Sequence, residues 1–382
     1  MRKTGRRWAG VVAVAGWLAL AGMAQAADLV ITSYSDNGVV GWTYPTSGVA
    51  GYRIEWAANL ATDKWTDIES GLRCLAPTGA TMAAEVPLFY RIKAMGAPPT
   101  NMVYIPPGTF RMGDTFSEAD SGERPVHNVF VSGFYMDRYE VTKTLWDTVA
   151  KWAATNGYDI TTNSAAGKGG PHPAQTVTWY EAVKWCNARS QSEGLAPCYF
   201  IDTIYLNLYM TGNLNISNTW VNWNANGYRL PTEAEWEKAA RGGASGYRFP
   251  WADNNISHGM ANYQAIGGSS YDLSNGAGYH PAYTNEGQPY TSLGGVSFAA
   301  NGYGLYDMAG NVWEWCWDWY RSDYYTASPA MNPQGPAARS GYRVKRGGSW
   351  FTIAYTARCS YRNHPEPDYK YNESGFRCAR GL

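Results

Sequence analysis

Charged side chains make up only 16% of this 382-residue chain, and no long run of basic residues is present. Binding to a phosphate backbone needs a positive surface, so the sequence argues against nucleic acid as a partner. The six cysteines include no Cys-x-x-Cys pair, the spacing typical of a tetrahedral zinc site. The five histidines are scattered as well, with no His-x-His or His-x-x-x-His spacing for iron or zinc.

The N-terminus has the order of an export signal. A basic start is followed by an apolar stretch at 11–20, which is shorter than the ~20 residues that span a bilayer. The small-x-small pattern at 24–26 is typical of a signal peptidase site. We therefore expect residues 1–26 to be a signal peptide and the mature chain to be periplasmic or extracellular, without a membrane span. The alternative is an uncleaved N-terminal anchor. The basic residues are Arg2, Lys3, Arg6 and Arg7.

The mature chain would be mildly acidic and rich in aromatic residues. Loss of residues 1–26 removes four basic side chains and leaves 27 against 31 acidic ones, a net charge of about −4. The chain also has 18 Trp, 29 Tyr and 42 Gly. Aromatic rings bury large areas and glycines permit tight turns. This composition predicts a loop-rich structure in which packed aromatic side chains replace long helices.

Residues 27–97 read as a small all-β module. Short runs alternate apolar and polar residues at 29–31, 39–42, 52–56 and 89–92. The Asn37-Gly38 pair is a strong signal for a two-residue hairpin turn, because both turn positions need a positive φ. The module is similar to a fibronectin-type sandwich but short for a complete one. We expect a spacer or packing module, joined by a linker at 96–99 to a second domain over 98–382.

The second domain mixes strands, helices and a long loop. Residues 102–105 and 126–135 are predicted strands, and 147–154 and 179–189 have the apolar spacing of helices. Another helix starts after Thr232, with Glu235 completing a capping box, and ends at Gly242-Gly243. Residues 244–306 show little periodicity. A loop of that length in a compact domain is usually functional or held by packing or metal.

Six sequence blocks follow one another through this domain. They resemble, in the same order, the blocks of the formylglycine-generating enzyme (sulfatase-modifying factor) family, a variant of the C-type-lectin-like fold. The resemblance covers residues 101–382 and implies a loop-rich α+β domain, although a fold by itself does not fix an activity. The blocks are NMVYIPPGTFRMG (101–113), ERPVH with FYMDRYEVT (123–142), GYRLPTEAEWE (227–237), NGYGLYDMAGNVWEW (301–315), RVKRGGSW (343–350) and GFR (375–377).

One part of the family pattern is missing. Family enzymes oxidise a sulfatase cysteine to formylglycine through two cysteines that bind copper(I), a soft ion that prefers thiolates. By resemblance these cysteines follow the Gly-Gly-Ser motif by three and eight residues, where this chain has Thr352 and Ala357. We therefore expect no copper site of the family type and no catalytic residues. Cys359 leaves a displaced single-thiol site as the enzymatic alternative.

The other cysteines are expected to be structural. The resemblance implies a Cys186–Cys378 disulfide. Such a crosslink would stabilise the folded chain by roughly 2–5 kcal/mol. Because Ala240 stands at the usual partner position of Cys359, a Cys316–Cys359 bond is a replacement pairing. Cys186–Cys198 is a rival pairing, and free reactive thiols are the functional alternative.

The resemblance also implies calcium as a cofactor. Calcium is a hard ion that binds carboxylate and carbonyl oxygens. The implied ligands are Asp307, the carbonyls of Gly310 and Val312, and Glu314, with Asn262 and the Tyr263 carbonyl at a second site. Otherwise Asp307 caps a turn and Glu314 pairs with an arginine.

Without the cysteine pair, the domain is expected to bind rather than to oxidise. The hypothesis is an exported, non-catalytic protein that recognises a peptide, glycan or envelope partner through a groove near residues 349–364. The alternative is a formylglycine-generating oxidase. Aromatic and amide side chains suit such contacts, whereas the arginines either line the groove or pair with acidic core residues. The predicted groove residues are Ser349, Trp350, Arg358, Arg362 and His364.

Overall fold

The computed structural model describes residues 98–118 and 121–382, together with six strands nearer the N-terminus. The predicted signal peptide, the turn at Asn37-Gly38 and the residues at 96–97 of the linker lie outside the described residues. Among the described residues, no helix is both long and apolar enough to cross a membrane.

The six N-terminal strands form two antiparallel groups. One sheet has the order β1-β2-β5-β4, and β3 pairs with β6. In the register of the backbone, Val40 pairs with Ala84 in the first sheet and Ile54 pairs with Ile92 in the second. The prediction of strands here is confirmed. The strands are β1 (Val30–Tyr34), β2 (Val39–Thr43), β3 (Gly51–Ala57), β4 (Arg73–Thr78), β5 (Thr81–Glu85) and β6 (Phe89–Met95).

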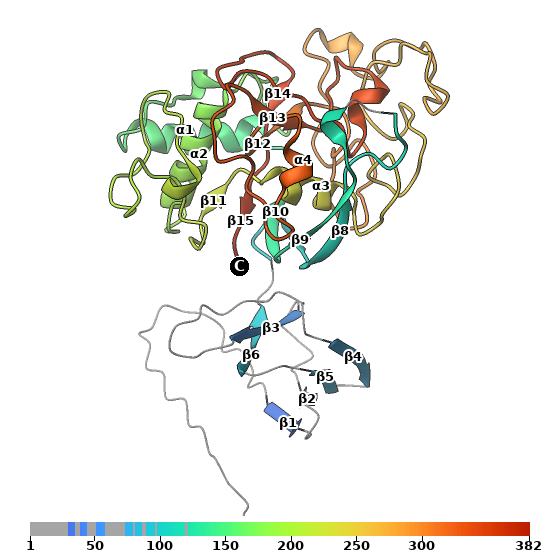
Figure 1. Ribbon diagram of the computed structural model, residues 1–382. Coiled ribbons are helices and arrows are strands. Elements are labelled where there is room, and N and C mark those ends of the chain that lie inside the picture. The colour runs from blue at the N-terminus through green and yellow to red at the C-terminus, as the bar shows by residue number, and fades with distance from the viewer. Residues whose placement is uncertain are drawn as a thin grey trace, which may run out of the picture.

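Three small sheets organise the residues that follow (Figure 1). The first has the order β11-β15-β10-β7, so that strands from both ends of the domain pair. The second is β13-β12-β14, and the third is β8-β9. The strands are β7 (Met102–Ile105), β8 (Gly108–Met112), β9 (His127–Val131), β10 (Phe134–Asp137), β11 (Tyr228–Arg229), β12 (Trp313–Trp319), β13 (Arg343–Arg346), β14 (Ser374–Gly375) and β15 (Ala379–Arg380).

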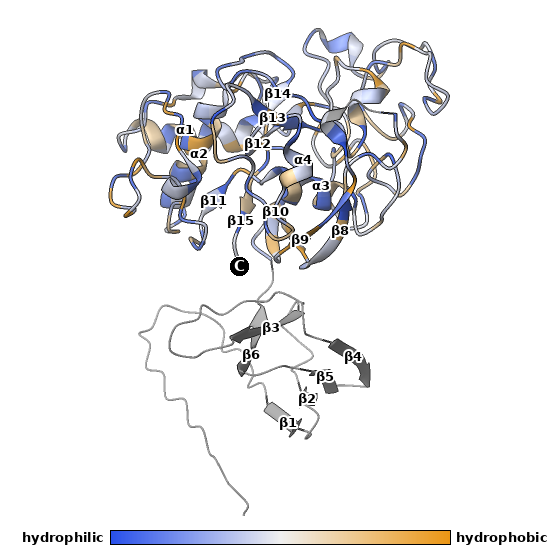
Figure 2. Cartoon of the chain, viewed as in Figure 1, coloured by the Kyte–Doolittle hydropathy of each residue, from blue (hydrophilic) through white to orange (hydrophobic). Residues whose placement is uncertain are grey.

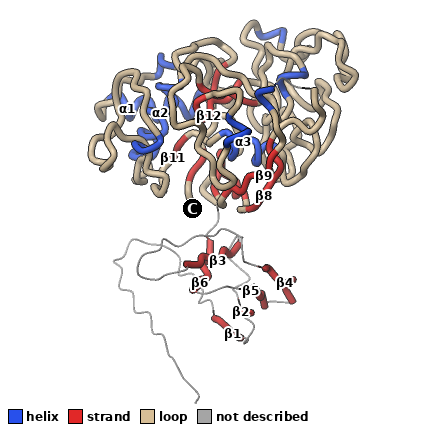
Figure 3. Tube along the Cα trace, in the orientation of Figure 1, coloured by secondary structure: helices blue, strands red, loops and turns tan. Residues whose placement is uncertain are grey.

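The helices are short, and loops make up most of the remaining chain (Figure 3). The capping box of α3 is present as predicted: Thr232 accepts from the Glu235 N–H, while Glu235 accepts from the Thr232 N–H. Residues 244–306 contain only a 3-10 turn at Thr284–Glu286 among their described helices and strands. The helices are α1 (Lys143–Ala154), α2 (Trp179–Ser192), α3 (Glu233–Ala240) and α4 (Tyr324–Ala327), with 3-10 turns at Ser121–Glu123, Thr162–Ser164, Asn218–Trp220 and Ala354–Ala357.

Tryptophans fill the largest core cluster, between α1, α2 and β12. The rings of Trp146 and Trp185 stack at 5.8 Å, and Trp179 lies 5.4 Å from Trp317. Their polar groups are satisfied: Trp179 Nε1 donates to the Cys316 carbonyl at 3.0 Å. Buried Trp combines a large apolar area with a hydrogen-bond donor. The composition-based prediction of an aromatic core is therefore correct.

Candidate functional site

The predicted groove segment starts at a glycine turn that follows β13. Gly347 and Gly348 both have positive φ, at 93° and 76°. A Cβ on Gly347 would lie 3.2 Å from the Trp236 ring, and one on Gly348 would lie 3.2 Å from the Ala357 Cα. Glycine is therefore required for the close approach of this turn to α3 and to the chain at 357.

Hydroxyl groups occupy the region where the family pattern would place thiols. Thr352 Oγ1 accepts from the Ser349 N–H at 2.9 Å, and Thr356 Oγ1 lies 2.8 Å from it. Ser349 Oγ is 3.4 Å from Thr352 Oγ1, and Ala357 is buried beside the glycine turn. Hydroxyls and a methyl group are poor ligands for a soft monovalent metal. The local chemistry is that of a hydrogen-bonding surface.

An aromatic cluster borders the hydroxyl groups. Phe351 is 48% exposed and its ring stacks on Tyr279 at 6.1 Å. Trp350, which is buried, lies 5.2 Å from Tyr290 and 5.4 Å from Phe351. Tyr279 and Tyr290 come from the long loop at 244–306, so this loop supplies one wall of the site. The exposed Phe351 ring packs against Tyr279 and Trp350 and leaves part of its surface available for contact with a ligand.

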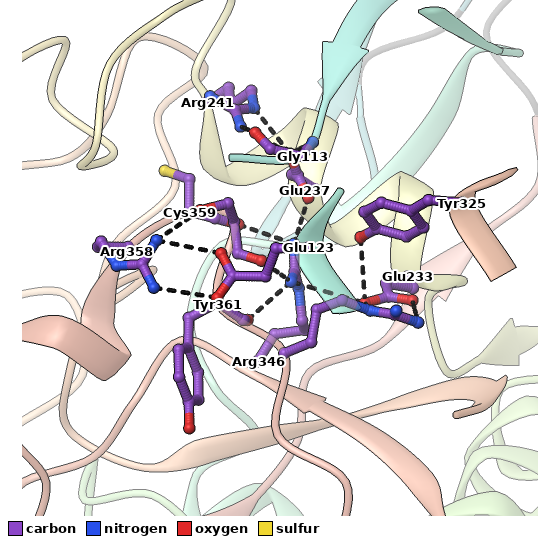
Figure 4. A network of polar contacts seen from close by, with 12 residues as sticks. Gly113, Glu123, Glu233, Glu237, Arg241, Tyr325, Arg346, Arg358, Cys359 and Tyr361 are labelled. Atoms are coloured by element: carbon purple, nitrogen blue, oxygen red, sulfur yellow. Dashed lines mark hydrogen bonds and ion pairs between the residues drawn. The ribbon is translucent and has the colours of Figure 1, made fainter. Parts of the chain in front are cut away.

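A buried arginine fixes the backbone of the groove segment. Arg346, in β13, donates through Nη1 to the carbonyls of Ser360 and Tyr361 and through Nη2 to that of Cys359, each at 2.7 Å. Nη2 also donates to Glu237 of α3, as Figure 4 shows. Burial lowers the pKa of Arg346, but the neighbouring Glu237 carboxylate raises it by more, so that the pKa lies above its ordinary value. The segment at 359–361 is thus held by a permanently charged group.

The two predicted groove arginines form buried ion pairs. Arg358 binds both oxygens of Glu123, at 3.0 Å each (Figure 4), and Arg362 binds both oxygens of Glu233, at 2.6 and 2.8 Å. The alternative in which these arginines pair with acidic residues of the core is confirmed. Arg362 also donates to the Gly122 carbonyl at 2.7 Å. Their charges stabilise the walls of the site.

The other predicted groove residues differ in exposure. Ser349 and Trp350 are buried, and His364 is exposed. The His364 ring stacks on Tyr320 at 4.0 Å, and the Arg362 guanidinium lies 4.7 Å from the centre of the same Tyr320 ring. The structure thus places Ser349 and Trp350 beside the exposed Phe351. A ligand-binding role for the five residues stays a prediction.

All five described cysteines are buried thiols. Cys186 Sγ and Cys378 Sγ lie 3.7 Å apart, so the pair implied by the family resemblance is brought into contact, while the bond itself stays a prediction. Burial raises the pKa of Cys359 to about 12 and that of Cys316 well above its ordinary value. A protonated, enclosed thiol is a poor nucleophile and metal ligand.

Asp307, Gly310 and Val312 of the predicted calcium ligands lie on the turn before β12, and Glu314 lies within β12. Asp307 has a φ of 55°, is buried, and accepts from the Gly295 N–H at 3.1 Å. Burial raises the pKa of Asp307 to about 6. Glu314 accepts from Arg377 Nε, Arg377 Nη2 and Trp236 Nε1 at 2.6–2.7 Å. The arginine pairing considered for Glu314 is confirmed, and about one of its four acceptor positions stays available.

A third carboxylate, which the sequence did not single out, belongs to this group. Glu140 is fully buried and accepts from the Asn311 side chain at 2.5 Å and the Val312 N–H at 3.0 Å. Burial, then Asp307 and Glu314, raise the pKa of Glu140, whereas Arg377 lowers it. Glu314 is bonded to Arg377, and the charges of Glu140 and Asp307 also raise the pKa of that arginine. The only sequence signal was the position of Glu140 in a family block, because periodicity carries no trace of this clustering.

The oxygen donors of this region fit a hard cation. The excess of buried carboxylate over arginine favours a positive ion, and Asn262 Oδ1 is buried without a hydrogen-bond partner. Asn262 touches the turn directly, since its carbonyl accepts from the Asn311 N–H at 2.8 Å. Within the described residues, no group of three His, Cys, Asp or Glu side chains is arranged to hold a metal. A cation here would therefore depend on the Gly310 and Val312 carbonyls.

Known proteins place the domain in a family. Residues 90–382 match the sulfatase-modifying factor enzyme 1-like domain. The chaperone protein LppX of Paenibacillus barcinonensis is 35% identical over 256 residues, which cover 66% of this chain and 82% of that protein. The formylglycine-generating enzyme of Mus musculus is 34% identical over 299 residues, covering 73% and 75%.

A solved structure has the same fold. Treponema denticola variable protein 1 superposes with a TM-score of 0.54 at 28% identity, covering 74% of this chain and 95% of that one. The loop-rich α+β architecture expected from the sequence is confirmed by this similarity. The relatives include a protein named as a chaperone and one named as a formylglycine-generating enzyme. This chain belongs to the sulfatase-modifying factor family.

Proposed function

We propose that the chain is an exported binding protein that uses its sulfatase-modifying-factor domain to recognise a peptide, glycan or envelope partner without oxidising it. The observation that carries this proposal is the hydroxyl network of Ser349, Thr352 and Thr356 beside the buried Ala357. Copper(I) chemistry needs converging thiolates, whereas this network offers neutral donors and acceptors.

The aromatic cluster supplies the contact surface for this function. Phe351 is exposed above Tyr279 and Trp350, and the hydroxyl of Thr352 lies one residue away. A ring next to hydroxyl groups suits a sugar ring or the side chain and backbone of an extended peptide. The buried arginine pairs keep this surface rigid, which lowers the entropy lost on binding.

Binding to a peptide library and to isolated envelope polymers tests the proposal. We expect measurable affinity that Phe351→Ser lowers by about tenfold or more, as loss of an exposed aromatic anchor does. Tyr371→Ser is the matched control, because Tyr371 is 57% exposed and lies outside the aromatic cluster. Equal loss in both variants, or no affinity of the wild-type chain, would contradict the proposal.

We also propose calcium as a structural ion at Asp307, Glu314 and the carbonyls of Gly310 and Val312, with Asn262 at a second calcium site. The unpartnered Asn262 Oδ1 and the excess of carboxylate around Arg377 support it. When bound, the ion supplies positive charge and no redox chemistry. The bound ion then lowers the free-energy cost of burying the charged carboxylates of Asp307 and Glu140. It also holds the turn that leads into β12 in place.

The alternative function is a formylglycine-generating oxidase with a displaced thiol site. The 34% identity to the mouse formylglycine-generating enzyme favours it. Its only thiol within the groove segment is Cys359, whose carbonyl is bound by Arg346 and whose thiol is buried. Such an enzyme would have to expose and deprotonate this thiol before a metal or substrate could bind.

A further inference from the structure

The loop at residues 201–206 carries exposed apolar side chains and is remote in the sequence from the groove segment at 349–364. We name Ile201, Ile204, Tyr205 and Leu206 the apolar tip. Ile204 is 69% and Leu206 75% exposed. Figure 2 shows orange, hydrophobic backbone in this loop at the left edge of the view, beyond α1 and α2. Contiguous exposed apolar side chains on a soluble domain mark an interaction site.

The loop is built as a rigid hairpin. Phe200 pairs with Leu208, and the Ile201 N–H donates to the Asn207 carbonyl at 2.8 Å. The two chain segments at the base of the loop are anchored to α2, because Asn187 Nδ2 donates to the carbonyls of Tyr199 and Tyr209 at 2.7 and 3.1 Å. The exposed side chains are therefore presented by an ordered base.

The backbone of the tip is largely satisfied from within. Asp202 Oδ1 accepts from the N–H groups of Ile204 and Leu206, at 2.9 and 3.2 Å, and Oδ2 from that of Asn207 at 2.7 Å. Tyr205 takes a positive φ of 58° at the apex and packs on Phe200 at 5.4 Å. A loop whose N–H groups are already bonded loses little when it leaves water.

Charge is almost absent from this part of the sequence. Between Glu193 and Arg229, Asp202 is the only charged residue, and it faces the backbone of its own loop. Thr203 and Asn207, next to the tip residues in the sequence, are neutral and polar, and Tyr205 offers a hydroxyl next to an apolar ring. Aromatic residues of this kind favour the boundary between lipid and water.

We propose that the apolar tip inserts into the surface of a lipid bilayer and holds the domain there. Four side chains on a convex apex are few for a protein interface, which covers ~800 Å² and 20–30 residues on each partner. A lipid layer needs no matching cavity. With so small an apolar area the attachment is weak and reversible, and without basic residues it does not depend on anionic lipid.

A site-specific fluorescent label on the full chain tests this directly. Leu206→Cys and Leu273→Cys, each carrying an environment-sensitive dye, are mixed with phosphatidylcholine vesicles. Leu273 is 62% exposed on the loop at 244–306, so it is a matched position. We expect a blue shift for the label at 206 and none at 273. Equal shifts, or no shift at either position, would overturn the proposal.

Vesicle sedimentation of unlabelled variants separates lipid from protein contacts. We expect the double variant Ile204→Ser, Leu206→Ser to bind about tenfold more weakly or worse, since it loses most of the exposed apolar area. The double variant Leu273→Ser, Val296→Ser should bind like the wild type. Added anionic lipid should change neither result. A wild-type dimer that the tip variant abolishes, with no vesicle binding, would assign the tip to a protein contact and overturn the proposal.

Discussion

Arg358 and Glu123, which are 235 positions apart in the sequence, form a buried two-bond ion pair with both N–O distances at 3.0 Å. The pair joins the groove segment to the residues before β9. Neither side chain is more than 5% exposed, so neither charge can be left alone without a large loss of solvation. The ion pair therefore stabilises the fold and does not contact a ligand directly.

Removal of one partner should therefore destabilise the fold. We expect Arg358→Met to lower the free energy of unfolding by about 3–5 kcal/mol, because Glu123 becomes an unpaired buried anion. Urea unfolding measures this change. The double variant Arg358→Met, Glu123→Gln should recover much of the loss. Arg321→Met is the surface control, since its pair with Asp323 is exposed and should contribute less than about 1 kcal/mol.

A buried lysine should make stability depend on pH. Lys345 is fully buried over the rings of Trp315 and Tyr369, at 4.0 and 4.3 Å, and donates to Ser374. Burial lowers its pKa well below the ordinary value, although Glu373 opposes the shift. Between this lowered folded-state pKa and the ordinary value near 10.5, the unfolded chain binds a proton that the folded chain has lost, so the contribution of Lys345 to stability should rise with pH across that window.

Lys345→Met tests this reasoning. We expect a gain of about 1–3 kcal/mol in the free energy of unfolding at pH 7, because the cost of burying the amine is removed. The gain should shrink as the pH rises toward the pKa of the lysine in the unfolded chain. Thermal unfolding between pH 7 and 9.5 is the measurement, and parallel pH profiles of the two proteins would contradict it.

Calcium should stabilise the folded chain. We expect added calcium to raise Tm and a chelator to lower it, with a gain of about 2.7 kcal/mol at a concentration one hundred times Kd. Asp307→Asn should lose most of this response, while Asp323→Asn, an exposed carboxylate, should keep it. Magnesium should act less, since it tolerates irregular carbonyl ligands poorly. Identical Tm values with calcium and with chelator would refute a calcium site.

Oxidation should join Cys186 and Cys378. Their sulfur atoms are already in contact at 3.7 Å between α2 and the C-terminal segment. We expect mass spectrometry of the non-reduced, exported chain to find a peptide that links these two residues. Cys186→Ser should lower stability by roughly 2–5 kcal/mol under oxidising conditions and by much less in reductant. A linked peptide that joins Cys186 to Cys198 instead would contradict this assignment.

Local signals predicted much of the secondary structure. Thr232 and Glu235 defined the start of α3, because a capping box acts within one helical turn. The apolar spacing at 179–189 located α2, which in the structure extends to Ser192. The predicted strand at 126–135 is two strands, β9 and β10, which are separated at Ser132-Gly133 and belong to different sheets. Periodicity does not detect so short a break between apolar residues.

The site was less predictable than the fold. The family pattern located Thr352, Ala357 and Asp307, but it did not show that Tyr279 packs on Phe351. That contact joins an aperiodic loop to a glycine turn over a long sequence separation. For the same reason, the sequence allows Arg358 either to line the groove or to pair with an acidic residue of the core. Its partner lies in a different block, and only the folded chain brings the two together.

The most direct test of a binding rather than an oxidising role is incubation of the full chain with a sulfatase-derived cysteine peptide, oxygen and copper(I). We predict that the peptide mass stays unchanged, while a formylglycine-generating enzyme assayed in parallel converts the thiol to an aldehyde. Ala357 and the hydroxyl of Thr352 supply no thiolate for the metal. Conversion of the peptide by this chain, lost in Cys359→Ser, would contradict the binding role and establish a displaced thiol site.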